Sequence, residues 1–377
     1  MRNQRERRTI LLNFAFARMV RLLLKVADKR GPLDVAMISN YRDEVDVRKF
    51  GFASIDKTPD VLSWIRYVWE DRYKARLFMI GSITEQIGGD SATPMSISRA
   101  AQQFEKAVEQ AVSLGAKVIL YAAATKRLPM WDILKERHPD VVFTLGDNFT
   151  GLLLGRRITD GFSRFNIVPK TSRVLIIAPY GLLGSCALHF TIYAGATVVG
   201  MGNPKRKSLL EGLKKKYDIE TCTSFEDVGK VDMVIACNSA PRSQLTPERV
   251  ALIRKPGRKL LVIDPNEPQN MSPELLANSS GNVIRLDSGN GISRQLKHVL
   301  EPVSYKLLRL DRGVTWGCFC EAFILADNPH LHNINWLEVT PENISIMQSY
   351  LGSGKGQFDL PSPTCFNQPL LDFNLAN

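Results

Sequence analysis

The clearest pattern of apolar and polar positions lies between residues 173 and 202. An apolar run at residues 174–177 is followed by a turn with two glycines, a helix-compatible segment and a second apolar run at residues 196–199. Short apolar runs rich in β-branched residues are typical of buried parallel strands. The pattern therefore predicts a strand–helix–strand unit, and we expect the rest of the chain to be organised around it.

Short apolar runs and helix-compatible segments also alternate on both sides of this unit. Upstream, the pattern predicts strands at residues 34–38, 52–55, 77–83, 117–121 and 141–144, and helices at residues 96–114, 130–137 and 148–165. Downstream, it predicts a helix at residues 209–217, strands at residues 231–236, 259–263 and 283–286, and helical structure from residue 294, including a buried helix at residues 314–325. Such alternation indicates parallel α/β layers, one of them formed by residues 77–146.

These elements predict an α/β protein. We expect a doubly wound Rossmann domain that binds NADP, and a second α/β substrate domain completed by C-terminal helices. The substrate domain is placed at residues 1–150, the Rossmann domain at residues 151–292 and the C-terminal helical segment at residues 293–377. A chain of 377 residues with 44% hydrophobic and 23% charged residues is long enough for two or three domains and has an ordinary soluble composition.

The turn after residue 177 has the composition of a phosphate-binding loop. Its glycines let the backbone approach a diphosphate, while the next helix directs its N-terminus at the same group. The usual first glycine of the fingerprint is replaced by Ala178 or Tyr180, depending on how the pattern is aligned.

Asn238 and Ser239 lie at the end of a later strand. They either contact ribose or nicotinamide or only form a turn. The expected cofactor-binding residues are Tyr180, Gly181, Leu182, Leu183, Gly184, Asn203, Lys205, Arg206, Asn238 and Ser239.

The end of the second strand indicates which dinucleotide binds. An NAD-preferring domain carries Asp or Glu there to bind the ribose hydroxyls. This chain has Gly-Asn-Pro-Lys-Arg-Lys at residues 202–207, with three basic residues and no acid. NADPH is therefore the expected cofactor, the alternative being that the basic residues only begin a solvated helix.

The net charge of +11 is concentrated at the N-terminus. Residues 1–30 hold nine basic and two acidic residues, which gives +7. Apolar residues recur between the arginines at helical spacing, so the segment predicts a basic amphipathic helix that either packs on its domain or contacts a membrane surface. Arg18 and Arg21 exclude a membrane-spanning helix. The charge fits an acidic partner such as nucleic acid, an anionic membrane or an acidic protein.

The six cysteines have no spacing that suits a disulfide framework or a zinc site, so we expect no metal and a reducing, cytoplasmic compartment. An alcohol or ketone reductase needs a Tyr/Lys or His/Asp pair, whereas a thioester reductase needs a cysteine thiolate. The chain lacks Tyr-x-x-x-Lys after Cys237 but offers Cys318 on the expected buried helix. An unpaired cysteine on an apolar helix is more often a packing residue than a nucleophile.

Residues 315–344 resemble the C-terminal signature of the long-chain acyl-[acyl-carrier-protein] reductases of cyanobacteria, a family related to shikimate-dehydrogenase-like Rossmann proteins. The positions that carry the resemblance are Cys318, Phe319, Glu321, Ala322, Asn333, Trp336, Thr340 and Glu342, and upstream Ser82, Gly146, Thr150, Gly181, Gly184 and Ser185. It covers roughly residues 77–350. Two positions depart from the family: Ala178 replaces the first glycine, and Arg312 is offset from the arginine that precedes the family's cysteine.

The resemblance implies NADPH-dependent reduction of a fatty acyl thioester to an aldehyde, with the acyl group carried on Cys318. Arg312 and Ser82 are the further catalytic candidates, and His330 or His332 could move a proton. The thioester would arrive on an acidic acyl carrier protein or on coenzyme A, and the basic surface would speed that encounter. Nucleic acid is then not expected, while peripheral membrane contact through the N-terminal helix and homo-oligomerisation are left open. The alternatives are an NADP-dependent dehydrogenase of a small carbonyl compound and a non-catalytic NADP-binding partner protein.

Overall fold

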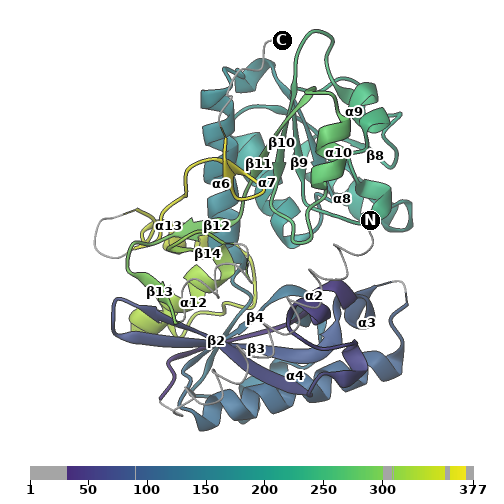
Figure 1. The fold of residues 1–377 in the computed structure, drawn as a ribbon. Helices are drawn as coiled ribbons and strands as arrows, with labels where there is room; N and C mark the ends of the chain where they lie inside the picture. Colours follow the sequence, from purple (N-terminus) through teal and green to yellow (C-terminus); the bar gives the residue numbers. More distant parts are fainter. Residues whose placement is uncertain (1–31, 90, 300–307, 309, 353–356, 371–377) are drawn as a thin grey trace. The chain divides into compact units, whose positions relative to one another are not determined.

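The computed structural model describes residues 32–89, 91–299, 308, 310–352 and 357–370, and the expected basic N-terminal helix lies outside them. The chain forms two compact units (Figure 1). Unit 1 consists of Met1–Gly146, Ser293–Gly313 and Cys318–Glu338, and unit 2 of Asp147–Ile292, Val314–Gly317 and Val339–Asn377. The C-terminal segment that we expected to be separate is thus divided between the two units. In the described residues, no helix is both long enough and apolar enough to cross a membrane.

Unit 2 contains the doubly wound sheet predicted from the sequence. Its strands are β6 (Arg173–Ile177), β7 (Thr197–Met201), β8 (Glu220–Cys222), β9 (Met233–Ala236), β10 (Leu260–Asp264) and β11 (Val283–Asp287). They are parallel and lie in the order β11-β10-β9-β6-β7-β8. The strand order reverses between β6 and β9, and doubly wound sheets bind ligands beyond the carboxyl ends of the strands at such a point. The predicted fold class is confirmed.

Helices of unit 2 pack on both faces of this sheet, except α13, which packs on α6. They are α6 (Asp147–Arg164), α7 (Leu182–Tyr193), α8 (Lys207–Tyr217), α9 (Pro247–Ile253), α10 (Pro273–Asn278) and α13 (Pro341–Gln348). Val174 and Ile176 of β6 join the core with residues of α6 and α7, whereas Leu175 and Ile177 join the core with residues of α9. Because successive strand residues point to opposite faces, one apolar run serves two cores.

Unit 1 is built on a mixed sheet in the order β13-β2-β3-β1-β4-β5. The strands are β1 (Val35–Tyr41), β2 (Val61–Trp69), β3 (Tyr73–Ile83), β4 (Val118–Tyr121), β5 (Val142–Thr144) and β13 (Leu296–His298). β1, β3, β4 and β5 are parallel, but β2 and β13 pair antiparallel. The sequence predicted a parallel layer and missed β2, because Ser63 and Arg66 interrupt its apolar pattern. β2 pairs antiparallel with the adjacent β3 and with the distant β13.

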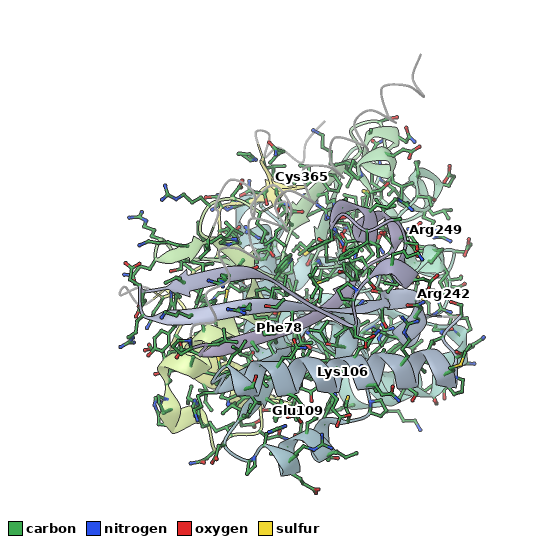
Figure 2. The ribbon with its side chains drawn as sticks, turned by 60° about the horizontal axis from the view of Figure 1, so that its bottom comes forward. Phe78, Lys106, Glu109, Arg242, Arg249 and Cys365 are labelled. Atoms are coloured by element: carbon green, nitrogen blue, oxygen red, sulfur yellow. The ribbon has the colours of Figure 1, made fainter. Side chains whose placement is uncertain are left out.

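The helices of unit 1 are α2 (Glu44–Lys49), α3 (Thr84–Gly88), α4 (Pro94–Ser113), α5 (Trp131–Arg137) and α12 (Gly317–Asp327). Figure 2 shows the long α4 beside Phe78 of β3. The buried face of α4 carries Ala100, Phe104, Ala107, Val108 and Ala111, which share one core with Phe78. On the other face, Lys106 pairs with Asp60 at 2.5 Å. This amphipathic spacing is why the sequence predicted α4 well.

Three expected elements differ from the structure. Residues 52–55, expected as a strand, form a loop that leads into the 3-10 turn η1 (Ile55–Lys57), because Gly51 has a φ of +81° and turns the chain. The expected helix at residues 314–325 begins instead with β14 (Val314–Trp316), which pairs antiparallel with β12 (Asn290–Ile292). The segment after residue 294 includes β13 rather than only helices. An apolar run alone cannot distinguish a short strand from a buried helix.

α12 is buried on nearly all sides, as expected. Its Phe319 and Phe323 pack on the β2 aromatics Tyr67 and Trp69, with ring centroids 5.8 and 5.7 Å apart. These two phenylalanines are therefore core residues. At the helix C-terminus, Tyr73 Oη donates to Asp327 Oδ1 at 2.7 Å, and burial together with this hydrogen bond raises the pKa of Tyr73 to about 12.

His298 makes unit 1 sensitive to acid. Its side chain is 2% exposed and lies 4.5 Å from the Tyr67 ring, centroid to centroid. Burial lowers its pKa to about 4. An exposed imidazole in the unfolded chain has a pKa of about 6.5. The unfolded state therefore binds the proton more strongly, so the free energy of unfolding falls as the pH drops below about 6.5, and this loss is complete below about 4.

We expect His298→Phe to remove this part of the pH dependence. Between about pH 7.5 and about pH 4.5, the wild-type protein should lose roughly 2–3 kcal/mol more of its free energy of unfolding than the variant does. Urea denaturation at both pH values measures the difference. The control His189→Gln, at an exposed position on α7, should behave as the wild type. Equal losses in wild type and His298→Phe would contradict the assignment.

Candidate functional site

The turn between β6 and α7 has the backbone geometry of a phosphate-binding loop. Ala178 follows β6 and has a φ of +59°, a backbone conformation that favours glycine. Ala178 therefore stands where the fingerprint has its first glycine, and its backbone is strained. At Gly184 an added Cβ would lie 2.0 Å from the Ala178 carbonyl oxygen. At Gly181 an added Cβ would meet only that oxygen, at 3.5 Å. Gly184 is thus required for packing, whereas Gly181 keeps space open above the turn.

The N-terminus of α7 faces this turn. Gly181 is its N-cap and supplies no side-chain hydrogen bond to the first amides of the 12-residue helix. Such amides and the helix dipole together favour a bound phosphate. Leu182 is 42% exposed, and Leu183 packs against the core of unit 2. Leu183 can therefore serve a ligand through its backbone, whereas the Leu182 side chain is exposed.

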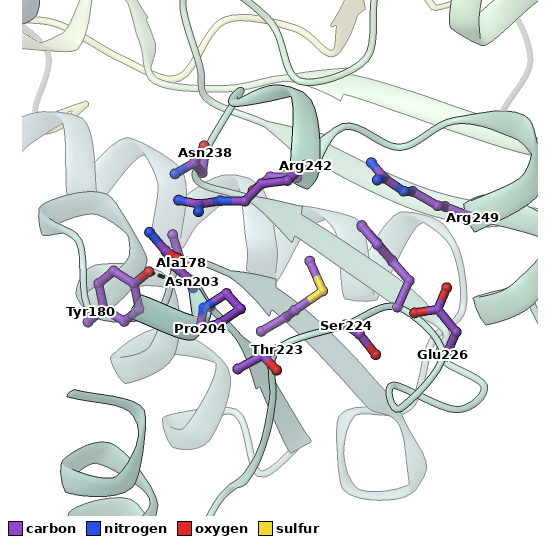
Figure 3. Close-up of a pocket in the computed structure, with 14 residues that line it drawn as sticks. Ala178, Tyr180, Asn203, Pro204, Thr223, Ser224, Glu226, Asn238, Arg242 and Arg249 are labelled. Atoms are coloured by element: carbon purple, nitrogen blue, oxygen red, sulfur yellow. Dashed lines mark hydrogen bonds between the residues drawn. The ribbon is translucent and has the colours of Figure 1, made fainter. Parts of the chain in front are cut away.

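A cavity of ≈250 Å³ opens at the carboxyl end of the unit 2 sheet (Figure 3). It is lined by Ala178 and Tyr180 after β6, residues 201–204 at the end of β7, residues 223–226 after β8, Asn238, Arg242 and Ser243 after β9, and Arg249 of α9. Tyr180 Oη accepts a hydrogen bond from the Asn203 amide at 2.9 Å. The structure thus brings together Tyr180, Asn203 and Asn238, which the sequence placed in the cofactor site from three separate strand ends.

The basic residues of this cavity differ from the predicted ones. Lys205, Arg206 and Ser239 are not among its lining residues. The Lys205 amide donates to Asn203 Oδ1 at 3.0 Å, and the Arg206 guanidinium lies 5.9 Å from the Tyr180 ring. The lining cations are Arg242 and Arg249. The sequence signal that could have identified Arg242 is its place shortly after β9, at the ligand-binding edge of the sheet.

Cys318 lies in the first turn of α12 and is half-buried. A Cβ added at Gly146, which has a φ of +69°, would lie 2.3 Å from Cys318 Cβ, so only glycine allows this approach. The Gly146 amide donates to Thr144 Oγ1 at 2.9 Å, and Thr144 Oγ1 donates to Glu321 Oε1 at 2.5 Å. Glu321 is fully buried. Three positions that carry the family resemblance, Gly146, Cys318 and Glu321, are therefore joined by packing and hydrogen bonds.

Gly317, the residue before Cys318, is held in unit 2. Its amide donates to the Gly289 carbonyl oxygen at 2.7 Å, in the turn after β11. A Cβ added at Gly317 would lie 2.8 Å from that oxygen and 2.9 Å from Thr150 Cα. The peptide that leads into Cys318 is thus anchored at the carboxyl edge of the Rossmann sheet.

The other candidate catalytic residues have these places in unit 1. Ser82 is 2% exposed, and its hydroxyl donates to Gln103 Oε1 at 2.7 Å. Arg312 is exposed in the turn before β14. His330 is exposed, and His332 Nε2 lies 2.8 Å from the Leu325 carbonyl oxygen, so it donates there. The Ser82 hydroxyl and the His332 ring are thus each engaged in a hydrogen bond within unit 1.

Burial disfavours the thiolate form of three other cysteines. It raises the pKa of Cys222 to about 11, and it also raises the pKa of Cys237 and of Cys365. A thiol with a raised pKa is protonated at neutral pH and reacts slowly. Cys318 differs in position, because the N-terminus of a helix favours a negative charge.

Comparisons by sequence identify no family for this chain. No protein-family model matches the sequence, and no curated protein matches it. Among solved structures, a dipicolinate synthase from Bacillus halodurans is similar at 11% identity and a TM-score of 0.34, over 68% of this chain and 91% of that chain. A dipicolinate synthase from Bacillus subtilis is similar at 9% identity and a TM-score of 0.34, over 79% of this chain and 96% of that chain.

A third similar structure is CAD from Helicobacter pylori complexed with NADP(H), at 14% identity and a TM-score of 0.28, over 44% of this chain and 41% of that chain. Similarity at these levels identifies no shared function. The function of this chain must therefore be inferred from its own residues.

The two glycines of the turn give a matched pair of variants. Gly184→Ala should lower the free energy of unfolding by about 1–3 kcal/mol, because its methyl group collides with backbone. Gly181→Ala should leave stability close to wild type but weaken NADPH binding on the order of tenfold, because the methyl group fills the space that the diphosphate needs. Urea denaturation and fluorescence titration with NADPH measure the two effects. Wild-type NADPH affinity in Gly181→Ala would show that the turn does not hold the diphosphate.

Proposed function

We propose that the protein is an NADPH-dependent reductase that converts an acyl thioester into an aldehyde through an acyl group held covalently on Cys318. The observation that carries the proposal is the hydrogen bond from the Gly317 amide to the Gly289 carbonyl oxygen, 2.7 Å long. It anchors the residue next to Cys318 at the edge of the sheet where doubly wound domains bind dinucleotides. The resemblance of residues 315–344 to long-chain acyl-[acyl-carrier-protein] reductases supports the same role.

The residues of unit 2 fit a phosphorylated dinucleotide. The open space at Gly181 and the N-terminus of α7 suit the diphosphate. The end of β7 offers Asn203 instead of an acid, and the adjoining cavity includes Arg242. The cation, together with the lack of a carboxylate at the end of β7, favours a 2′-phosphate over a plain ribose. When bound, NADPH supplies the hydride that reduces the acyl group.

Cys318 would act as the nucleophile. Its thiolate attacks the carbonyl carbon of the thioester, the new Sγ–C bond forms, and the bond between that carbon and the carrier's sulfur breaks. The carrier leaves as a thiolate that takes up a proton. After reduction, the Sγ–C bond breaks, the aldehyde is released and Cys318 returns as a thiolate. The N-terminus of α12 stabilises this anion at both stages.

Glu321 and Thr144 would position the nucleophile rather than react. The buried Glu321 accepts from Thr144, and Thr144 accepts from the Gly146 amide. Gly146 in turn packs against Cys318. These contacts fix the backbone on one side of the thiol. A nucleophile held in a defined position loses less entropy on reaching the transition state, which lowers the activation free energy.

The carrier of the acyl group is proposed from charge. The net charge of +11 favours an acidic acyl carrier protein or coenzyme A as the partner. Within the described residues, exposed lysines and arginines gather on α8 and the turn before it, at Lys205, Arg206, Lys207, Lys214, Lys215 and Lys216. Opposite charge on the carrier would raise its rate of association, and salt would reduce the effect.

Acyl transfer to Cys318 gives the direct test. Wild-type protein incubated with octanoyl-coenzyme A, without any reductant, should gain the mass of one octanoyl group, and Cys318→Ser should not gain a thioester-linked group that hydroxylamine removes. Cys222→Ser is the control. Cys222 is a half-buried residue of β8, and the variant keeps Cys318, so it should be acylated as the wild type is. Intact-protein mass spectrometry measures both.

A labile adduct that persists in Cys318→Ser would refute the proposed nucleophile. Aldehyde formation from octanoyl-coenzyme A and NADPH, followed by NADPH absorbance, should fall by at least about 10³-fold in Cys318→Ala, because the covalent route is lost. Reduction of small carbonyl compounds that survives this substitution would favour the alternative dehydrogenase.

A further inference from the structure

We propose that Arg242, on the loop after β9, binds the 2′-phosphate of NADPH, and that Arg249 and Asn270 hold that loop in position. This inference rests on the proposed use of NADPH and names the residues that select it. The basic run at residues 205–207, which the sequence pointed to, is then not the phosphate-binding element.

The placement of Arg242 in the cavity is the first argument. Doubly wound domains meet the ribose 2′-oxygen at the end of the second strand, which is β7 here. That end carries Asn203 and Pro204, and Arg242 comes from the opposite side of the same cavity (Figure 3). A phosphate at this place would be met by an amide side chain and a guanidinium group. Arginine binds phosphate with two parallel hydrogen bonds, which adds specificity as well as affinity.

The loop that carries Arg242 is fixed by hydrogen bonds from Asn270. Asn270 is fully buried, and its Nδ2 donates to the carbonyl oxygens of Asn238 at 2.6 Å and Ser243 at 2.7 Å. Its Oδ1 accepts from the Leu245 amide at 3.0 Å. One buried side chain therefore ties together both ends of the loop.

Arg249 holds the middle of the same loop. Its Nη1 donates to the carbonyl oxygens of Pro241 at 3.1 Å and Gln244 at 2.7 Å. Its guanidinium also lies 4.9 Å from the centroid of the Phe225 ring. Arg249 thus positions the backbone on both sides of Arg242. A cation presented from a preorganised loop loses less conformational entropy when it binds a ligand.

The other charged residues near the cavity do not offer the same geometry. Lys205 and Arg206 are exposed and do not line the cavity. Glu226 does line it and would repel a phosphate, but in Figure 3 Glu226 lies at the end of the cavity opposite Tyr180 and Asn203. The negative charge is therefore separated from the position that Arg242 serves.

Binding of nucleotides with and without the 2′-phosphate tests the assignment. Calorimetric titrations of wild type, Arg242→Gln and Arg206→Gln would use NADPH, NADH and 2′,5′-ADP, the last of which carries the phosphate without the nicotinamide. We expect Arg242→Gln to weaken NADPH and 2′,5′-ADP on the order of 10- to 100-fold and to leave NADH within about twofold. Arg206→Gln, the matched control, should keep the wild-type preference for NADPH.

The positioning role of Arg249 has its own readout. Arg249→Gln should reduce the NADPH-to-NADH affinity ratio in the wild-type background but not in the Arg242→Gln background, because it acts through Arg242. A purely structural role would weaken both nucleotides equally in both backgrounds, and that result would overturn this part of the inference.

The outcomes separate the two proposals. If Arg206→Gln or Lys205→Gln removes the preference and Arg242→Gln does not, the inference fails while the proposed function stands. If wild type binds NADH as tightly as NADPH, no 2′-phosphate is recognised and the inference also fails. If neither dinucleotide binds, the proposed reductase function fails. Acylation of Cys318 needs no reductant, so its result is independent of all these titrations.

Discussion

The cavity at the carboxyl edge of the unit 2 sheet depends on the buried pair of Asp264 and Arg285. Both side chains are at most 1% exposed, and Asp264 Oδ2 accepts from Arg285 Nε at 3.2 Å and Nη2 at 3.1 Å. The same oxygen accepts the Asn270 amide at 2.9 Å. A buried ion pair is stable only when further hydrogen bonds satisfy it, and loss of one partner costs about 3–5 kcal/mol. The pair therefore links β10 and β11 to Asn270, and Asn270 sets the loop that carries Arg242.

Glycines set a second constraint at the proposed nucleophile. Gly146 packs on the Cys318 backbone within unit 1, and Gly317 packs on Gly289 and Thr150 within unit 2. Any side chain at either glycine would collide with backbone atoms. The first turn of α12 is thus defined by close backbone contacts, and a thiol on rigid backbone is better placed for covalent catalysis than one on a loop. The position of Cys318 is therefore determined by packing as well as by the local sequence motif.

The sequence predicted those elements whose pattern is local. Five parallel strands of unit 2 (β6, β7, β9, β10 and β11) and the amphipathic α4 were predicted within a few residues, because burial on one or two faces gives a hydrophobic period that is visible along the chain. The short edge strand β8 was not predicted. β13 and β14 were missed, because antiparallel pairing between segments far apart leaves no local signal. β2 was missed although it pairs with the adjacent β3, because polar residues interrupt its apolar pattern. For the site, Tyr180, Asn203 and Asn238 followed from strand ends, whereas Arg242 and Arg249 did not, because residues 205–207 offered a nearer basic run.

By itself, the sequence determined the doubly wound fold, the place of the glycine-bearing turn after β6 and the candidacy of Cys318, since hydrophobic period, glycine spacing and a cysteine on an apolar segment are properties of adjacent residues. Only the tertiary structure decided which cations reach the cavity, that Ala178 adopts a left-handed conformation, and that Gly146 and Thr144 stand next to Cys318 and Glu321. The reason is physical: a side chain's direction and partners depend on how distant segments pack, and that packing is not encoded in any short stretch of the chain.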